Sequence, residues 1–132
     1  WLTQRAWSTI PKCSELQRLS LRGVHDISDH HVKEIVLHCT NLEDLDLSFC
    51  VEITVAGLMD MHRLQYLRHL GLPENVSSRE ISSILGKILT LQYLELQLTD
   101  CDIAFFREIA TLRNLRTLKL SRRNNTAITP KI

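Results

Sequence analysis

The stretch LEDLDL, residues 42–47, decides the fold because its spacing of leucines recurs along the chain. The pattern L-x-x-L-x-L occurs five times, at steps of 26, 25, 24 and 24 residues. Every leucine position of every copy is filled, and self-similarity at such a period is the signature of a repeat architecture. The leucines concerned are Leu16, Leu19, Leu21, Leu42, Leu45, Leu47, Leu67, Leu70, Leu72, Leu91, Leu94, Leu96, Leu115, Leu118 and Leu120.

A second apolar pattern lies between the leucine blocks and has the spacing of one helix face. A residue that favours the helix N-cap follows its first member in each copy except the last, where Asp102 is the expected cap. In that last copy we expect Phe106 in the core and Phe105 partly exposed. The other expected caps are Thr3, Ser28, Thr54 and Ser77. The predicted stripes are Leu2, Trp7, Ile10, Cys13; Ile27, Val32, Ile35, Cys39; Ile53, Leu58, Met61, Leu64; Val76, Ile81, Ile84, Ile88; and Ile103, Phe106, Ile109, Leu112.

Each repeat is therefore expected to be a short strand followed by a capped helix that returns the chain to the next strand. One such unit cannot cover its own leucines, so neighbouring units stack and share a core. The repeat length falls within the range typical of leucine-rich repeats. The predicted fold is an α/β leucine-rich-repeat right-handed solenoid, a horseshoe arc with parallel strands on the concave face and helices on the convex face.

We expect residues 1–132 to form a single segment of about five repeats. Leu2-Thr3 matches the helical half of a repeat, and Ile128-Thr129-Pro130 matches the start of another helix. These matches predict that the segment is truncated at both ends of a longer array.

Cysteine placement predicts the compartment. Cys13 and Cys39 both lie three positions before a leading leucine, so we expect both to be buried, unpaired core residues. Free cysteines favour a cytoplasmic or nuclear location. Two glycosylation sequons, at Asn75 and Asn124, point the other way, although such triplets are common by chance.

Composition and motifs argue against several classes of function. The formal net charge is +1, no apolar run approaches the roughly 20 residues of a membrane span, and we expect neither membrane nor nucleic-acid binding. A basic cluster at Arg113, Arg116, Lys119, Arg122 and Arg123 lacks interleaved aromatic residues and is interpreted as a solvated edge. No metal-ligand spacing, glycine-rich phosphate loop or nucleophile motif occurs. The sequence therefore predicts no enzyme, no cofactor and no metal site.

Residues 42–58, LEDLDLSFCVEITVAGL, resemble the cysteine-containing leucine-rich repeat of F-box and leucine-rich-repeat proteins, L-x-x-L-x-L-x-x-C-x-x-I-T-D-x-G-L. Ile27-Ser28-Asp29 with Cys39, and Leu2-Thr3 with Cys13, match the same pattern. The resemblance is strong in the first half of the chain. Later repeats hold Asn75, Thr99 and Arg123 where the loop cysteine is expected.

The resemblance implies a protein-protein interaction module, the substrate-recognition repeats of an F-box type (SCF) E3 ubiquitin ligase receptor. In that family the F-box binds the adaptor of a cullin ligase, and the repeats capture the substrate. No F-box pattern is visible in this chain, so binding to the cullin-ligase adaptor is expected only if an F-box lies outside it. The alternative is a ligase-independent scaffold or assembly factor, for example in mitochondrial complex assembly.

Residues that alternate with the leucines are expected to face solvent on the concave side, where a protein partner would bind. One predicted row is Arg18, Asp44, His69, Tyr93 and Thr117, and a second is Ser20, Asp46, Gly71, Glu95 and Lys119. Their acidic centre and basic ends fit a partner with a basic central element. The full set of candidate binding residues is Arg18, Arg22, Asp44, Asp46, Phe49, His69, Tyr93, Glu95 and Lys119.

Three alternatives stay open on this surface. Neighbours such as Arg18 and Asp44 could form ordinary cross-strand charge pairs. Phe49 could contact the partner or fold into the loop beneath the cysteine. Gly71 leaves a bare patch that admits a partner's side chain, or it marks a weak repeat.

Overall fold

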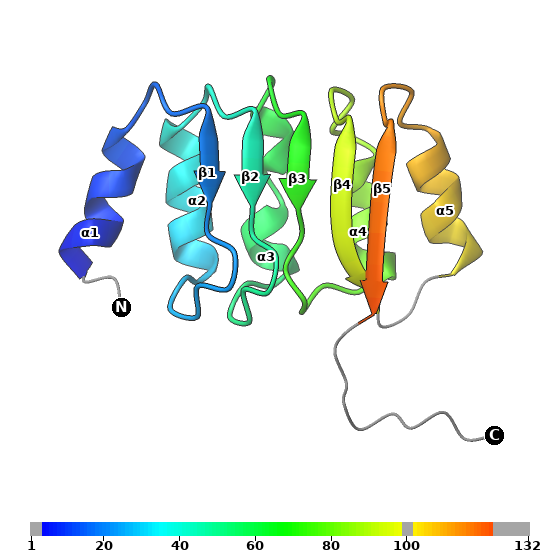
Figure 1. Ribbon diagram of the computed structural model, residues 1–132, viewed down its shortest axis with the longest axis horizontal. Helices are drawn as coiled ribbons and strands as arrows, with labels where there is room; N and C mark the ends of the chain where they lie inside the picture. The colour runs from blue at the N-terminus through cyan, green and yellow to red at the C-terminus, as the bar shows by residue number, and fades with distance from the viewer. Residues whose placement is uncertain (1–3, 99–101, 123–132) are drawn as a thin grey trace, which may run out of the picture.

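The computed structural model describes residues 4–98 and 102–122, and in these residues five parallel strands form one sheet (Figure 1). Their order in the sheet is the order along the chain. The parallel sheet predicted from the leucine spacing is therefore confirmed. The strands are β1 (Arg18–Ser20), β2 (Asp44–Asp46), β3 (His69–Gly71), β4 (Tyr93–Leu98) and β5 (Thr117–Arg122).

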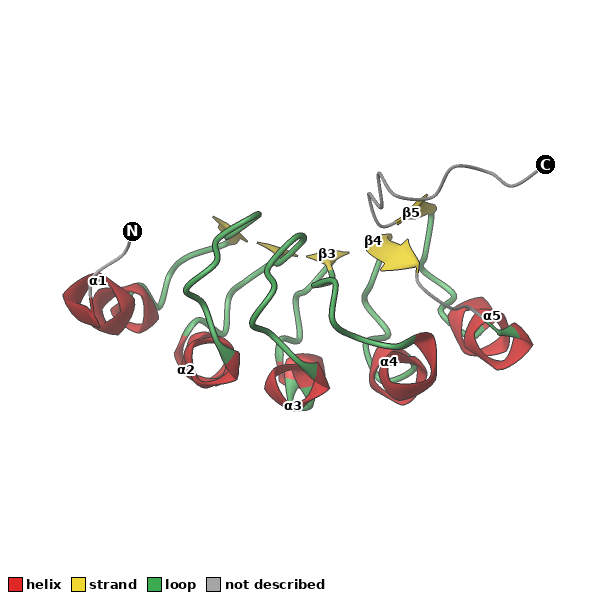
Figure 2. Cartoon of the chain, turned by 90° about the horizontal axis from the view of Figure 1, so that it is seen from below, coloured by secondary structure: helices red, strands yellow, loops and turns green. Residues whose placement is uncertain are grey.

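The helices form a second layer. Figure 2 shows them in a curved row on one side of the sheet, with the strands along the inner side of the curve. The predicted assignment of strands to the concave face and helices to the convex face is confirmed. The helical elements are α1 (Gln4–Thr9), η1 (Ile10–Lys12), α2 (Asp29–His38), α3 (Val55–Leu58), η2 (Met61–Arg63), α4 (Ser78–Leu85) and α5 (Ile103–Ala110). None of the described helices is long and apolar enough to span a bilayer.

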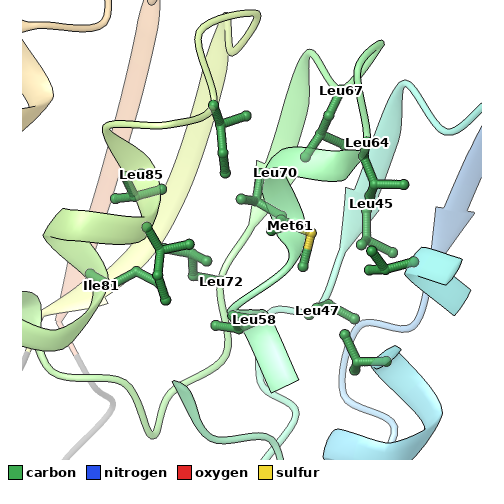
Figure 3. Packing of buried hydrophobic residues seen from close by; sticks show 14 of the residues in the cluster. Leu45, Leu47, Leu58, Met61, Leu64, Leu67, Leu70, Leu72, Ile81 and Leu85 are labelled. Atoms are coloured by element: carbon green, nitrogen blue, oxygen red, sulfur yellow. The ribbon is translucent and has the colours of Figure 1, made fainter. Parts of the chain in front are cut away.

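The core lies between the two layers and is continuous along the solenoid. In Figure 3, Leu45, Leu47 and Leu70 from the strand layer meet Leu58 and Met61 from the helical layer. Each of these side chains is at most 1% exposed. Burying one such side chain stabilises the fold by about 1.5–3 kcal/mol, so the stacked leucines are the main source of stability.

The leucines are less well covered at the two edges of the described sheet. Leu19 on β1 and Leu118 on β5 are only partly buried, and Leu120 is 39% exposed. The leucines of β2 and β3 are at most 1% exposed, so full burial is reached in the interior of the described sheet. The reason is that a strand at the edge of a stack is covered by a neighbouring repeat on one side only.

Helix caps follow the sequence prediction. Thr54 Oγ1 accepts a hydrogen bond from Ala56 N, Ser77 Oγ accepts one from Glu80 N, and Asp102 Oδ1 accepts one from Phe105 N. Ser28 is the N-cap residue of α2, and its backbone N donates to His31 Nδ1 at 3.0 Å. The predictions for Leu2 and Thr3 lie outside the described residues.

The predicted core stripe of α5 is wrong. Phe105 is fully buried, whereas Phe106 is 42% exposed and Ile103 is 68% exposed. Phe105 lies one helical turn before Ile109, which is also buried, and both belong to the face that packs on the sheet. The sequence pattern instead predicts a stripe in steps of three from Ile103, which selects Phe106.

The prediction for the cysteines is correct for Cys39 and wrong for Cys13. Cys39 and Cys50 are fully buried, whereas Cys13 is exposed. Cys13 belongs to the first described helical unit, so no described repeat packs against its outer side. All three are free thiols, and Cys101 lies outside the described residues.

Candidate functional site

Strand pairing places the predicted concave residues in the expected rows. Arg18, Asp44, His69, Tyr93 and Thr117 are register partners across the five described strands. The second row, Ser20, Asp46, Gly71, Glu95 and Lys119, is confirmed in the same way. Both rows project from the inner surface because the leucines between them face the core.

A hollow of about 290 Å³ lies at the centre of this surface. Gly71 is part of it because the third strand carries no side chain there. A Cβ at Gly71 would collide with Asp46 Oδ1 and lie 2.5 Å from Ser48 Oγ, so position 71 admits glycine alone without rearrangement. The lining residues are Asp44, Asp46, His69, Leu70, Gly71, Tyr93 and Glu95.

Arg22 crosses the concave surface from the segment after β1 to β4. Its Nη1 atom lies 3.2 Å from Asp46 Oδ2 and 3.2 Å from Glu95 Oε2, and its Nη2 atom lies 3.1 Å from Glu95 Oε1. Gly71 stands between Asp46 and Glu95 in the row. The absence of a side chain at this position leaves room for the two-pronged contact, the strong geometry for a guanidinium and a carboxylate.

Glu95 is the most enclosed charged group on the surface. It is 6% exposed, and Lys119 Nζ lies 3.2 Å from its Oε1 atom. The hydrogen bond from Arg22 lowers the pKa of Glu95, burial opposes this shift, and Lys119 adds to it. The same hydrogen bond raises the pKa of Arg22. Glu95 is therefore ionised and neutralised by the chain itself.

The alternative in which Arg18 forms an ion pair with Asp44 is not found in the structure. Asp44 Oδ2 instead lies 3.5 Å from His69 Nδ1, and Arg18 forms no ion pair with any described residue. Internal charge pairing therefore exists on this face, but it engages Arg22 in place of Arg18. The negative charge expected at the centre of the concave face is therefore partly neutralised by Arg22 and Lys119.

Phe49 packs beneath Arg22. The guanidinium carbon lies 4.8 Å from the centroid of the Phe49 ring, within the range of a cation–π contact. Phe49 has a φ of 62°, a left-handed conformation that bulky residues rarely adopt. It is half-buried, and the loop cysteine beside it, Cys50, donates to Leu21 O at 3.0 Å. Phe49 thus holds Arg22 in place, a role that neither of its two sequence interpretations included.

Asp44, His69 and Tyr93 remain as the accessible group of the hollow. The His69 and Tyr93 rings meet edge to face with centroids 5.8 Å apart. The side chains of Asp44 and His69 are 40% and 50% exposed. Among the residues that line the hollow, these three are the ones that a partner can reach without displacing Arg22.

A second cavity, of about 450 Å³, lies on the helical side between α1 and α2. Trp7 and His31 stack there with ring centroids 4.6 Å apart. Burial lowers the pKa of His31, and the neighbouring His30 adds to this effect. The sequence interpretation missed this cavity, although the histidines of α2 at positions 30, 31 and 38 could have indicated it. No group of side chains within residues 4–98 and 102–122 could hold a metal ion.

Comparison with known proteins identifies the architecture. No family model matches the chain. It is 32% identical over 117 residues to F-box/LRR-repeat protein 4 of Bos taurus, a match that covers 85% of the chain and 19% of that protein. The chain thus spans about a fifth of the length of this relative.

A solved structure shares the fold. The tropomodulin C-terminal domain of Caenorhabditis elegans superposes with a TM-score of 0.69 at 11% sequence identity, and the match covers 92% of this chain and 83% of that domain. Together with the repeat spacing and the parallel sheet, these similarities show a leucine-rich-repeat region.

Proposed function

We propose that this chain binds a protein partner on its concave face, as the substrate-recognition repeats of an F-box type ubiquitin ligase receptor. The observation that carries the first part is the central hollow, where Asp44, His69 and Tyr93 from three neighbouring strands line one accessible surface. Exposed aromatic and charged side chains around a depression are typical of binding hot spots.

Support for the ligase assignment comes from the similarity to a bovine F-box/LRR-repeat protein. A shared fold does not determine function, so the assignment depends on this sequence relationship and on the cysteine-containing repeat pattern. The proposal places binding to the cullin-ligase adaptor outside this chain. It also places the protein in the cytosol or nucleus, where free thiols such as Cys39 and Cys50 stay reduced.

The proposal further includes additional repeats stacked beyond the described sheet. Ile103 and Phe106 on α5 and Leu120 on β5 are exposed on the last described repeat. A further repeat would cover such side chains, because each unit of a solenoid packs against the next one.

The test compares two triple variants in the full-length protein. One replaces Asp44, His69 and Tyr93 by alanine. The matched control replaces Glu80, His62 and Tyr66, which carry the same chemical groups on exposed positions outside the strands. We expect the concave variant to lose the proteins that co-purify with the wild type, whereas the control variant retains them. Equal recovery with both variants would rule out the concave face as the binding surface.

The ligase half of the proposal has a separate readout. Proteins whose recovery depends on the concave face should carry less ubiquitin and live longer in cells that express the concave variant. Unchanged lifetimes, with binding still dependent on the concave face, would instead establish a ligase-independent scaffold.

A further inference from the structure

We infer that the hollow at Gly71 accepts a basic side chain of the partner, an arginine or a lysine. This inference rests on the proposed function, because it specifies which chemical group the concave face recognises. The occupant is defined by the charges and the space found at the hollow.

Charge is the first argument. Three carboxylates line the hollow, those of Asp44, Asp46 and Glu95, against two cations that contact them, Arg22 and Lys119. Within these ion pairs one negative charge is therefore left over when His69 is neutral, and Arg18, the register partner of Asp44, forms no ion pair with it. The group that carries it is Asp44, whose ion-pair partner within the described residues is His69 at 3.5 Å. A cationic side chain is attracted to this position, and an anionic one is repelled.

The chain itself demonstrates that this surface binds a guanidinium. Arg22 lies against Asp46 and Glu95 with three contacts of 3.1–3.2 Å and stacks on Phe49. Asp44 and Tyr93 offer the same two elements, a carboxylate and an aromatic ring, on the side of the hollow that Arg22 leaves open. Carboxylates and aromatic faces are the groups that recognise arginine and lysine side chains.

Asp46 is a fixed carboxylate in the wall of the hollow. Its Oδ1 atom accepts a hydrogen bond from Ser48 N at 2.9 Å, and Arg22 Nη1 lies 3.2 Å from its Oδ2 atom. Burial raises the pKa of Asp46, but the hydrogen bonds from Ser48 and Arg22 outweigh this effect and lower the pKa. The carboxylate is therefore ionised and held in position, and it adds to the attraction for an incoming cation.

Arg22 competes with the incoming cation, because both are attracted to Asp46 and Glu95. Removing the Arg22 charge should therefore strengthen binding of a basic side chain. Removing the Asp44 charge should weaken it. These opposite signs separate recognition of a cation from general effects on the fold.

The experiment uses three short peptides that differ at one residue, acetyl-Gly-Ser-X-Ser-Gly-amide with X as arginine, citrulline or glutamate. Citrulline has the shape of arginine without its charge. Each peptide is titrated into the ¹⁵N-labelled chain, and backbone amide shifts are followed. We expect the arginine peptide to shift the amides of Gly71, His69 and Tyr93 saturably, with citrulline binding at least about fivefold more weakly. The glutamate peptide should not bind.

Variants complete the test. Asp44→Asn should weaken binding of the arginine peptide about fivefold, and Arg22→Gln should strengthen it by a similar factor. Glu80→Gln, on α4 and outside the hollow, is the control and should change nothing. The dispersion of each spectrum verifies that the variant is folded.

The inference is overturned if the arginine peptide does not bind, if arginine and citrulline bind equally, if the glutamate peptide binds better, or if the shifts fall outside the hollow. Its failure is distinguishable from failure of the proposed function. Loss of cellular partners from the concave triple variant, together with equal binding of arginine and citrulline, would retain the concave face and reject only its basic ligand.

Discussion

At the scale of single residues, the concave surface depends on Gly71 and Arg22. The alternation of a strand was enough to predict both rows of outward residues. It could not predict that Arg22 binds Glu95, because these residues are 73 positions apart and meet only through the curvature of the sheet and the space above Gly71. Likewise, no local pattern indicates that Phe49 adopts a positive φ and carries the guanidinium of Arg22.

Replacing Gly71 by alanine should destabilise the fold. The added methyl group would collide with Asp46 Oδ1, which is held in place because it accepts a hydrogen bond from Ser48 N at 2.9 Å. Overpacking of this kind costs about 1–3 kcal/mol, and urea denaturation would measure the loss. Gly86→Ala is the control, because its Cβ would meet the end of the flexible Glu108 side chain and would lie at an ordinary contact distance of 3.6 Å from Ser82 O. Equal stability of the two variants would contradict the described geometry of the hollow.

At the scale of elements, neighbouring repeats are joined through their helix N-termini. Asp29 at the start of α2 accepts two hydrogen bonds from Thr54 before α3, from the backbone N at 2.8 Å and from Oγ1 at 2.6 Å. Gly57 lies against Asp29, and a Cβ there would be 2.5 Å from Asp29 Oδ1. This contact gives a physical reason for an aspartate and a glycine in the cysteine-containing repeat pattern, since the aspartate of one repeat packs on the glycine of the next.

Asp29→Ala should therefore lower the free energy of unfolding by about 1–3 kcal/mol, because Thr54 loses its acceptor for two hydrogen bonds. Asp29→Asn should have an intermediate effect, since its amide oxygen can still accept one of them. Thermal unfolding with Glu52→Ala as an exposed control would check this order. If Asp29→Ala unfolds at the same temperature as the wild type, the hydrogen bonds between Asp29 and Thr54 do not contribute to stability.

The N-terminus of α2 should be sensitive to acid. His31 Nδ1 accepts the hydrogen bond from Ser28 N, which requires the neutral ring. Burial, followed by the neighbouring His30, lowers the pKa of His31 below its ordinary value, against a small opposing effect of Asp26. A histidine with a depressed folded pKa contributes stability that is fully present above the unfolded pKa and is lost as the pH falls through that value toward the folded pKa.

We therefore expect stability to fall between about pH 7.5 and pH 5.5, and His31→Gln to reduce this dependence because its amide oxygen accepts at every pH. Exposed His62, replaced by glutamine, provides the control for the other histidines. An identical pH profile for wild type and His31→Gln would refute this role of the ring.

Two differences between the sequence prediction and the structure concern single helices. Asp102 was identified correctly as the cap of α5, but the cap alone did not decide which phenylalanine faces the sheet. Phe105 and Phe106 are adjacent and equally apolar, so only packing distinguishes them. In the third repeat the predicted helix is divided into α3 and η2, although Leu58, Met61 and Leu64 are all buried as expected. A core position can thus be predicted more reliably than the type of helix that carries it.

At the scale of the whole molecule, the architecture follows from the period of the leucines alone. The strand order, the parallel pairing and the single continuous core all come from stacking one unit on the next. The similarity to a tropomodulin domain at 11% identity fits this explanation, because stacking requires a pattern of apolar positions and little else.

The isolated 132-residue chain should be only marginally stable. Leu120, Ile103 and Phe106 are exposed on its last described repeat, where a neighbouring repeat would otherwise add buried apolar area. Appending one consensus repeat after β5 should raise the midpoint of thermal unfolding by several degrees. A monomeric chain that resists heat without such an addition would contradict this expectation.

The ion pair between Arg22 and Glu95 spans the concave face, because it links the repeat of β1 directly to the repeat of β4. A pure stack transmits force only between adjacent units, and each unit can tilt on its own. Flattening the arc would require breaking this ion pair. The resistance of the solenoid to bending therefore depends on four repeats acting together.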